Sequence, residues 1–317
     1  MEYKDVPHLV REFLMYMKTI KNRSKATMRE YYYDLRHTFR FIYAMKNNLD
    51  IYDIDKLDIS KLELSFFKDI TLMDLYEYLN FLSENKEDKS ATRARKVAAL
   101  KSFFNYLCLK AKVLDVNPAV ELETPKLDAR IPKYLNLDES KTLLNVIDGK
   151  HRERDYAIIT LFLNCGLRLS ELVNINFSNI KGDTLSIIGK GNKERSIYLN
   201  KACKEAINDY MYARSQLTNI KDKDALFLSN RGTRISPRMV EIMVKNNLEL
   251  AGLDTKKYSP HKLRHTAATL MHKHGNVDIR ALQQILGHES ISTTQIYTHI
   301  DNEQVKVALE SNPLNNI

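Results

Sequence analysis

The stretch NPAVELETPKLDARIPKY, residues 117–134, contains three prolines and shows little hydrophobic periodicity. A residue that precedes proline is biased away from the helical region, so such a stretch favours an extended linker. At 317 residues the chain is long enough for two domains, each with its own hydrophobic core. The stretch therefore predicts a linker between an N-terminal domain, residues 1–116, and a C-terminal domain, residues 135–317.

The residues before this linker have the composition of a helical domain. All nine glycines lie at or beyond Gly149, and apolar residues before it recur three and four positions apart. This pattern predicts helices near residues 7–20, 25–46, 65–84 and 91–112. Ser24 and Ser90 are expected to cap the second and the fourth of them.

The residues after the linker predict a mostly helical domain with a small antiparallel sheet. DESKTLLNVI (138–147) opens a helix with a capping pattern, and RERDYAIITLFLNCG (152–166) is an apolar helix that ends at Gly166. Residues 183–199, DTLSIIGKGNKERSIYL, alternate like two short strands around a glycine-rich turn. From Ser236 onwards the pattern is helical again, so the expected fold class is mainly α.

Composition limits the classes to which the chain can belong. Hydrophobic residues make up 44% and charged residues 28%, as in an ordinary soluble globular protein. No apolar run has membrane-spanning length and no signal-peptide core stands near the start, so we expect a cytoplasmic protein. Cys108, Cys165 and Cys203 are odd in number and widely spaced, which fits neither a disulfide framework nor a zinc site. The net charge of +9 favours a polyanionic partner such as nucleic acid.

The fourth expected helix is the best candidate for contacting DNA in the N-terminal domain. Its sequence, KSATRARKVAALKSFFNYL (89–107), places an apolar stripe beside basic residues. The basic residues are Lys89, Arg93, Arg95, Lys96 and Lys101. Such side chains can reach phosphates while the helix enters a major groove, although a solvated helix face has the same pattern.

Two segments of the C-terminal domain place arginines where a phosphate could be held. In GLRLSEL (166–172), Arg168 begins a helix and offers forked donors to two phosphate oxygens, and Glu171 can orient it through an ion pair. In SPHKLRHTAAT (259–269), His261 and Arg264 are spaced to share one helix face, which favours an anion between them. The histidines lack an HExxH or comparable spacing, so we expect no metal site.

Two more segments supply groups suited to proton transfer and nucleophilic attack. In GKGNKERSIYL (189–199), Lys190 lies in the hairpin turn, from which an ammonium group can donate a proton to a leaving oxygen. In LGHESISTTQIYTHI (286–300), His288 lies at a helix entrance and Tyr297 lies farther along. Tyrosine is a weak nucleophile at its ordinary pKa of about 10, but nearby arginines and a lysine would favour the phenolate. Each piece alone has a simple structural explanation, whereas the whole order indicates phosphodiester chemistry.

This order and spacing resemble the tyrosine recombinases, the integrase family of site-specific DNA recombinases, and most closely the Xer type. The resemblance covers essentially the whole chain. It implies a two-domain DNA clamp, in which an all-helical, SAM-like core-binding domain precedes the catalytic domain. It also implies that Tyr297 attacks the scissile phosphate and forms a 3′-phosphotyrosine. Arg168 and Arg264 then clamp the non-bridging oxygens, and Lys190 is the general acid toward the departing 5′ oxygen.

The resemblance also implies supporting roles. His261 assists proton transfer at the tyrosine, His288 donates a hydrogen bond to the phosphate, and Glu171 supports the arginines from behind. Lys193 and Arg195, in the same hairpin as the general acid, are expected to contact DNA.

The resemblance further implies double-stranded DNA with a specific recombination site as the partner, and no cofactor. A homo- or hetero-tetramer acts through a Holliday junction, with a paired recombinase as one option. The apolar surface of DNEQVKVALESNPLNNI (301–317) fits a C-terminal helix near residues 303–317 that packs into a neighbouring subunit. Residues 48–64 make a longer connection than compact Xer proteins have.

Several functions fit this pattern to different degrees. Xer-like resolution of chromosome or plasmid dimers comes first, and integration or excision of a mobile element is the alternative. A non-catalytic DNA-binding regulator would be favoured by substitution of a motif residue, and none of the six is substituted. A type IB topoisomerase-like enzyme would have no assembly tail, and a metal-free phosphoesterase would not need a basic helical N-terminal domain.

Overall fold

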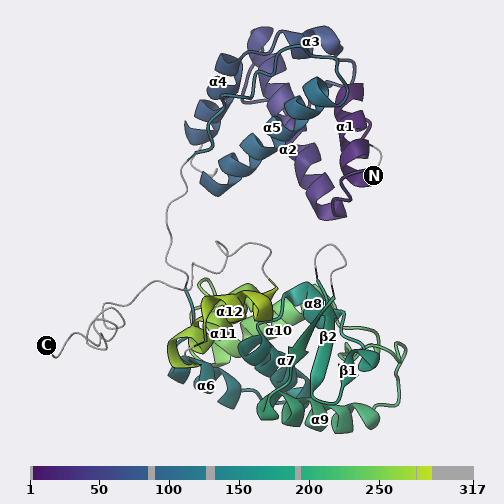
Figure 1. Ribbon diagram of the computed structural model, residues 1–317, viewed down its shortest axis with the longest axis vertical. Helices are drawn as coiled ribbons and strands as arrows, with labels where there is room; N and C mark the ends of the chain where they lie inside the picture. The colour runs from purple at the N-terminus through teal and green to yellow at the C-terminus, as the bar shows by residue number, and fades with distance from the viewer. Residues whose placement is uncertain (1–2, 85–89, 126–132, 190–193, 276, 288–317) are drawn as a thin grey trace, which may run out of the picture. The chain divides into compact units, whose positions relative to one another are not determined.

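The computed structural model describes residues 3–84, 90–125, 133–189, 194–275 and 277–287. The chain forms two compact units, Met1–Ala129 and Arg130–Ile317 (Figure 1), and each has its own hydrophobic core. No helix in the described part of the chain is long and apolar enough to cross a membrane.

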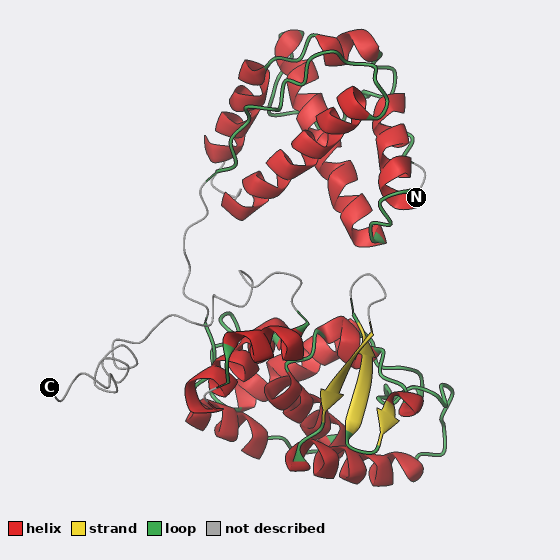
Figure 2. Ribbon diagram, viewed as in Figure 1, coloured by secondary structure: helices red, strands yellow, loops and turns green. Residues whose placement is uncertain are grey.

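The regular structure described in the first unit is helical, as the sequence predicts (Figure 2). Its helices are α1 (His8–Thr19), α2 (Lys25–Lys46), α3 (Leu64–Lys68), α4 (Leu72–Glu84) and α5 (Ser90–Leu109). Ser24 caps α2 by accepting a hydrogen bond from the Thr27 backbone N–H (3.2 Å). Ser90 is the first residue of α5 rather than a cap before it.

The single helix expected over residues 65–84 is in fact two helices. The Thr71 N–H donates to Asp74 Oδ2 (2.7 Å), and the Asp74 N–H donates to the Thr71 hydroxyl (3.2 Å). This reciprocal pair satisfies backbone donors at the start of α4, which is why a new helix begins there.

Aromatic side chains fill the core of the first unit. The ring centroid of Phe103 on α5 lies 5.5 Å from that of Phe13 on α1 and 5.2 Å from that of Phe39 on α2. The apolar stripe expected on α5 is fully buried, which confirms that this face belongs to the core. The stripe consists of Val97, Leu100, Phe103, Phe104 and Leu107.

Residues 48–64 pack on this core. Ile54 and Ile59 are buried, and Arg40 Nε of α2 donates to the Leu57 carbonyl (2.8 Å). The long connection is therefore an integral part of the first unit.

The beginning of the expected linker also packs on the first unit. Ala119 and Leu122 are buried in its core, and the Ala119 N–H donates to Asn117 Oδ1 (2.9 Å). Residues 117–122 therefore differ from the extended segment expected there, because two apolar side chains at a spacing of three anchor them. Residues 126–132 lie outside the described residues.

The second unit is built around one central helix, α7, which is apolar around most of its circumference and packs against α9 and α11 (Figure 1). Its helices are α6 (Leu137–Asn145), α7 (Arg152–Cys165), α8 (Leu169–Val173), the 3₁₀ helix η1 (Phe177–Asn179), α9 (Lys201–Ser215), α10 (Pro237–Leu250), α11 (Pro260–Gly275) and α12 (Ile279–Leu286). The helix expected from residue 138 is present, but its cap lies two residues earlier: Asn136 caps α6, and Glu139 completes the capping box.

The small sheet has three antiparallel strands in the order β1-β2-β3 (Figure 2). They are β1 (Ile180–Lys181), β2 (Thr184–Ile188) and β3 (Glu194–Tyr198). The last two confirm the expected hairpin, whereas β1, with two residues, is too short to produce an alternating pattern. Leu185 lies opposite Ile197 and Ile187 lies opposite Arg195, so Arg195 shares the face of the buried Ile197.

Cys165 and Cys203, widely separated in the sequence, are neighbours in the fold. Both thiols are free and buried, with the Sγ atoms 3.7 Å apart at the end of α7 and the start of α9. The hydrogen bond with Cys203, together with burial, raises the pKa of Cys165, so this thiol stays protonated.

Candidate active site

Arg168 is positioned by the turn that joins α7 to α8. Gly166 ends α7 in the left-handed conformation (φ 58°), which a residue with a side chain rarely adopts. Arg168 then stands at the start of α8, and its backbone N–H and Nη1 donate to the two carboxylate oxygens of Glu171, each at 2.8 Å. The expected ion pair between these two residues is therefore present.

Glu171 is the centre of a cluster of three guanidinium groups. Its oxygens also accept from Nη1 and Nη2 of Arg195 (2.7 and 3.0 Å), and Arg264 Nη1 lies 3.8 Å from Oε2. Burial raises the pKa of Glu171, but the hydrogen bonds from Arg195 and Arg168 outweigh it and hold that pKa below its ordinary value. One buried carboxylate thus faces three positive charges, which leaves an excess of two.

Arg264 of α11 is almost completely buried, at 2% exposure. Its Nη1 donates to the Gly166 carbonyl and its Nη2 to the Leu286 carbonyl, both at 2.6 Å. A buried cation without such partners would be very costly, so these bonds explain how the charge is tolerated. They also fix the guanidinium beside Glu171.

The C-terminal end of α12 is held by all three arginines. Its last carbonyls accept from Arg195 Nε at Ile285 (3.3 Å), from Arg264 Nη2 at Leu286 (2.6 Å) and from Arg168 Nη2 at Gly287 (3.0 Å). Carbonyls at the end of a helix lack partners within the helix and carry partial negative charge, so cations are stabilised there. The arginine cluster therefore fixes the point at which the chain leaves α12.

Two glycines allow this close packing. A Cβ at Gly166 would lie 2.7 Å from Leu286 Cδ2, and a Cβ at Gly287 would lie 2.8 Å from Arg195 Nη1. Both residues also have positive φ (58° and 63°). Glycine is therefore required at each position by its conformation and by the close approach of its neighbours.

His261 stands one turn before Arg264 on α11, with part of the residue exposed to solvent and part covered by protein. Desolvation by the surrounding protein, and then the charge of Arg264, lower the pKa of His261. His261 and Arg168 line the same hollow, about 600 Å³, between α8, α10 and the start of α11. Arg168 also lines a second hollow, about 650 Å³, together with Gly189 at the end of β2. Arg168 thus lines both the hollow that contains His261 and the hollow that contains Gly189, beside the β2–β3 hairpin.

Two family models match the chain. The model described as "Phage integrase family" matches residues 133–304, and the model described as "Phage integrase, N-terminal SAM-like domain" matches residues 10–110. The chain belongs to the phage integrase family.

Similarity to individual recombinases places the chain more closely within this family. The chain is 55% identical over 315 residues to tyrosine recombinase XerC of Caldanaerobacter subterraneus subsp. tengcongensis, an alignment that covers 99% of this chain and 89% of the relative. It is 38% identical over 244 residues to tyrosine recombinase XerD of Proteus mirabilis, covering 75% of this chain and 77% of the relative. The crystal structure of XerH bound to a palindromic difH substrate shares the fold, with a TM-score of 0.67 and 22% identity over 96% of this chain and 94% of that chain. The protein is therefore an enzyme, a tyrosine site-specific recombinase of the Xer type.

The structure of the recombinase brings together four of the seven residues expected at the catalytic site. Arg168, Glu171 and Arg264 are in direct contact, and His261 shares a hollow with Arg168. The expected site residues that lie outside the described residues are Lys89, Lys190, Lys193, His288 and Tyr297.

Arg195 differs from its expected place as a DNA contact. Its side chain is only 16% exposed, and its guanidinium is engaged by Glu171 and by the Ile285 carbonyl. The physical reason is strand alternation, because Arg195 stands two residues before the buried Ile197 and therefore points to the inner face. That alternation was the signal in the sequence that could have identified it.

Several basic residues of α5 also have intramolecular partners. Lys96 is buried, with its Nζ 3.5 Å from Asp34 Oδ1, so it differs from the exposed phosphate contact expected there. Arg95 contacts Asp34 and lies 3.1 Å from Glu30. Lys101 is half-buried and donates to the Val120 carbonyl (3.4 Å). Arg93, also half-buried, stays a predicted DNA contact.

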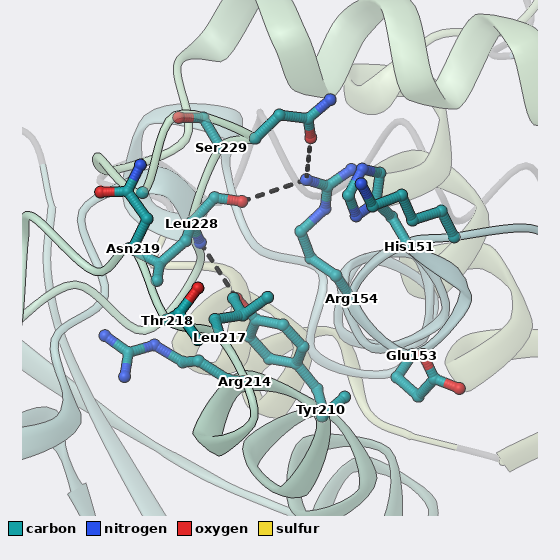
Figure 3. A pocket seen from close by; sticks show the side chains of 14 residues that line it. His151, Glu153, Arg154, Tyr210, Arg214, Leu217, Thr218, Asn219, Leu228 and Ser229 are labelled. Atoms are coloured by element: carbon teal, nitrogen blue, oxygen red, sulfur yellow. Dashed lines mark hydrogen bonds between the residues drawn. The ribbon is translucent and has the colours of Figure 1, made fainter.

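A separate pocket of about 190 Å³ opens at the other end of α7 (Figure 3). Arg154 lines it, donating through Nη1 to the Leu228 carbonyl (3.1 Å) and to Asn230 Oδ1 (3.4 Å). The Tyr210 hydroxyl accepts from the Leu228 N–H (3.0 Å). These polar groups bond to other groups of the protein itself, and the length of α7, about 20 Å, separates them from Gly166. The pocket is therefore distinct from the arginine cluster.

Proposed function

We propose that the recombinase exchanges DNA strands through an ester of Tyr297. The tyrosine oxygen attacks the scissile phosphorus and forms a new P–O bond, while the bond from phosphorus to the 5′ oxygen breaks. A 3′-phosphotyrosine and a free 5′-hydroxyl result, and attack by the 5′-hydroxyl of another strand reverses the step. One phosphate ester replaces another, so no ATP or other cofactor is consumed.

The observation that carries this proposal is the excess of two positive charges around Glu171. The transition state of phosphoryl transfer places additional negative charge on the non-bridging oxygens, and preorganised cations stabilise that charge. Arg168 is one-third exposed and Arg264 is fixed beside it, which supports their roles as the two clamps on the phosphate. Glu171 holds both guanidiniums in place.

Lys190, His261 and His288 complete the proposed chemistry. Lys190 donates a proton to the departing 5′ oxygen, and His288 donates a hydrogen bond to the phosphate. His261 accepts the proton that the attacking tyrosine loses. The lowered pKa of His261 supports this role, because a neutral imidazole at pH 7 has a free lone pair for a proton.

The proposed partner is a DNA duplex with a specific recombination site. Residues 1–116 act as the core-binding domain, with Arg93 of α5 contacting phosphate, and residues 135–317 act as the catalytic domain. A homo- or hetero-tetramer on DNA carries out the exchange through a Holliday junction. Similarity to both XerC and XerD supports resolution of chromosome or plasmid dimers in the cytoplasm, with a paired recombinase contributing subunits in the hetero-tetramer.

A covalent trapping experiment tests the nucleophile. The recombinase is incubated with a nicked duplex that carries its recombination site, and a protein–DNA adduct that resists denaturation is measured. We expect Tyr297→Phe to abolish the adduct while DNA affinity changes little. Tyr212→Phe, at a tyrosine that is 75% exposed on α9, is the matched control and should leave the adduct intact. An adduct that persists in Tyr297→Phe would show that another residue is the nucleophile.

A truncation tests the proposed assembly segment. Deletion of residues 303–317 should weaken formation of the tetramer on DNA more than binding to a single site, because only the tetramer needs the contact between subunits. Gel-shift titrations that resolve monomer and tetramer complexes measure both. Equal loss of both complexes would contradict an assembly role.

A further inference from the structure

We propose that Arg195 is a positioning residue, which ties the β2–β3 hairpin to the arginine pair and thereby sets the reach of the general acid. The inference rests on the function proposed above. Lys190 belongs to the segment that joins β2 to β3, and Arg195 is the second residue of β3. A fixed Arg195 therefore fixes the strand that begins directly after the Lys190 segment.

The contacts of Arg195 are those of an internal brace. Nη1 and Nη2 donate to both oxygens of Glu171 (2.7 and 3.0 Å), which is the forked geometry that arginine forms with a carboxylate. Nε donates to the Ile285 carbonyl (3.3 Å). All three nitrogens are engaged inside the protein, and the side chain is 16% exposed. Arg195 is therefore less accessible to a DNA phosphate than Arg168, whose side chain is one-third exposed, and its contacts join elements of the protein itself.

This brace joins three separate elements. Glu171 lies on α8, one turn after Arg168. Ile285 lies near the end of α12, and Arg195 itself belongs to β3 of the sheet. Gly287, the residue before His288 in the sequence, has space for Arg195 only because it lacks a Cβ. The side chain of Arg195 thus links β3, which follows Lys190 in the chain, to α8, which follows Arg168, and to α12, which precedes His288.

The chemistry makes this position sensitive. A general acid must lie within hydrogen-bond distance of the leaving oxygen, and a displacement of about 1 Å can cost on the order of 100-fold in rate. Loss of Arg195 leaves Glu171 with its bonds to Arg168, so the clamp on the phosphate persists while the hairpin loses its attachment. The defect should therefore appear in protonation of the 5′ oxygen.

A substrate with sulfur in place of the bridging 5′ oxygen isolates that step. A thiolate leaves without a proton, so cleavage of this substrate does not need the general acid. We expect Arg195→Ala to slow adduct formation about 100-fold on the oxygen substrate and to recover to within about tenfold of the wild type on the sulfur substrate. Lys190→Ala should show the same recovery, and DNA affinity should stay within about threefold.

Two further variants keep the test decisive. Arg195→Lys keeps the charge without the fork, so we expect an intermediate rate, and it serves if Arg195→Ala does not fold in a thermal melt. Arg152→Ala, at an exposed arginine that begins the far end of α7, is the matched control and should cleave both substrates like the wild type.

The outcomes separate this inference from the proposed function. If the sulfur substrate is cut as slowly as the oxygen substrate by the Arg195 variants, Arg195 does not act through the acid and the inference is overturned. Loss of DNA affinity in parallel with cleavage would instead make Arg195 a phosphate contact, which also overturns it. Failure of the wild-type protein to form any adduct would count against the proposed function itself.

Discussion

Each unit of the recombinase contains a buried carboxylate surrounded by basic side chains, but the two clusters differ in their balance of charge. In the first unit, Asp34 of α2 pairs with Arg95 and Lys96 of α5, and Glu30 adds a second carboxylate. In the second unit, Glu171 alone faces three guanidiniums. The first cluster is neutral, whereas the second keeps two positive charges in excess.

The two carboxylates respond to burial with opposite results. Burial raises the pKa of Asp34, and the charges of Lys96 and Arg95 do not compensate for it. Burial acts in the same direction on Glu171, but the hydrogen bonds from Arg195 and Arg168 lower its pKa overall. The comparison shows that basic residues near a packed face can be paired with carboxylates of the protein itself, which leaves no net charge for a ligand. Of the two clusters, the one with surplus charge is the one proposed to bind a phosphate.

The largest effect is expected when one positive charge is removed from the cluster around Glu171. Arg264→Ala should reduce the rate of adduct formation on the order of 1,000-fold, because one of the two proposed clamps on the phosphate is lost. The rate is measured with saturating protein on the nicked duplex, so that differences in affinity do not enter. Arg95→Ala, which removes a guanidinium from the neutral cluster, is the matched control and should leave this rate within about threefold. Equal losses in the two variants would mean that the clusters do not differ in function.

The second cluster shows how far sequence reasoning extends. Gly166, Arg168 and Glu171 follow one another within six residues, so capping rules and helical spacing predict their arrangement. Arg264 and His261 are predicted to share a face for the same reason. These predictions depend on local geometry, which the sequence specifies directly.

The missed features depend on contacts between distant segments. Lys96 follows Arg95 on the same helix, and nothing in α5 itself shows that Asp34, on α2, will bury it. The contact between Cys165 and Cys203 likewise forms only when α7 packs against α9. The hydrogen bonds from arginines to the carbonyls at the end of α12 form only when α12 packs against α11 and α11 against α7. For Arg195, strand alternation in β3 indicates a side chain on the inner face, whereas the basic composition of its hairpin indicates a DNA contact.

A smaller effect is expected when the neutral cluster is broken. Asp34→Ala should lower the free energy of unfolding by about 3 kcal/mol, because it leaves the buried Lys96 without its carboxylate. Urea unfolding followed by far-UV circular dichroism measures this loss. Glu30→Ala, at a carboxylate that is 42% exposed, should cost no more than about 1 kcal/mol. The cleavage rate at saturating Asp34→Ala protein should stay unchanged. That result would sharpen the comparison, because it would show that the cluster around Asp34 affects the stability of the protein and not the rate of its reaction.

The smallest expected effect concerns the free energy of unfolding at acid pH, to whose pH dependence the two carboxylates contribute with opposite signs. The pKa of Asp34 is raised above its ordinary 3.8, so the folded state binds this proton more tightly, and the resulting stabilisation is lost as pH rises through the raised pKa. The pKa of Glu171 is lowered from 4.5, so its contribution is present above that pH and is lost as pH falls.

Substitutions that remove each titration should therefore act in opposite directions. Asp34→Asn should make the free energy of unfolding rise more steeply with pH just above pH 4, and Glu171→Gln should make it rise less steeply below about pH 4.5. Urea unfolding at a series of pH values measures both slopes, with Asp138→Asn, at a carboxylate 92% exposed, as the control that changes neither. Slopes that move in the same direction would remove the electrostatic distinction between the clusters on which the proposed phosphate site at Glu171 rests.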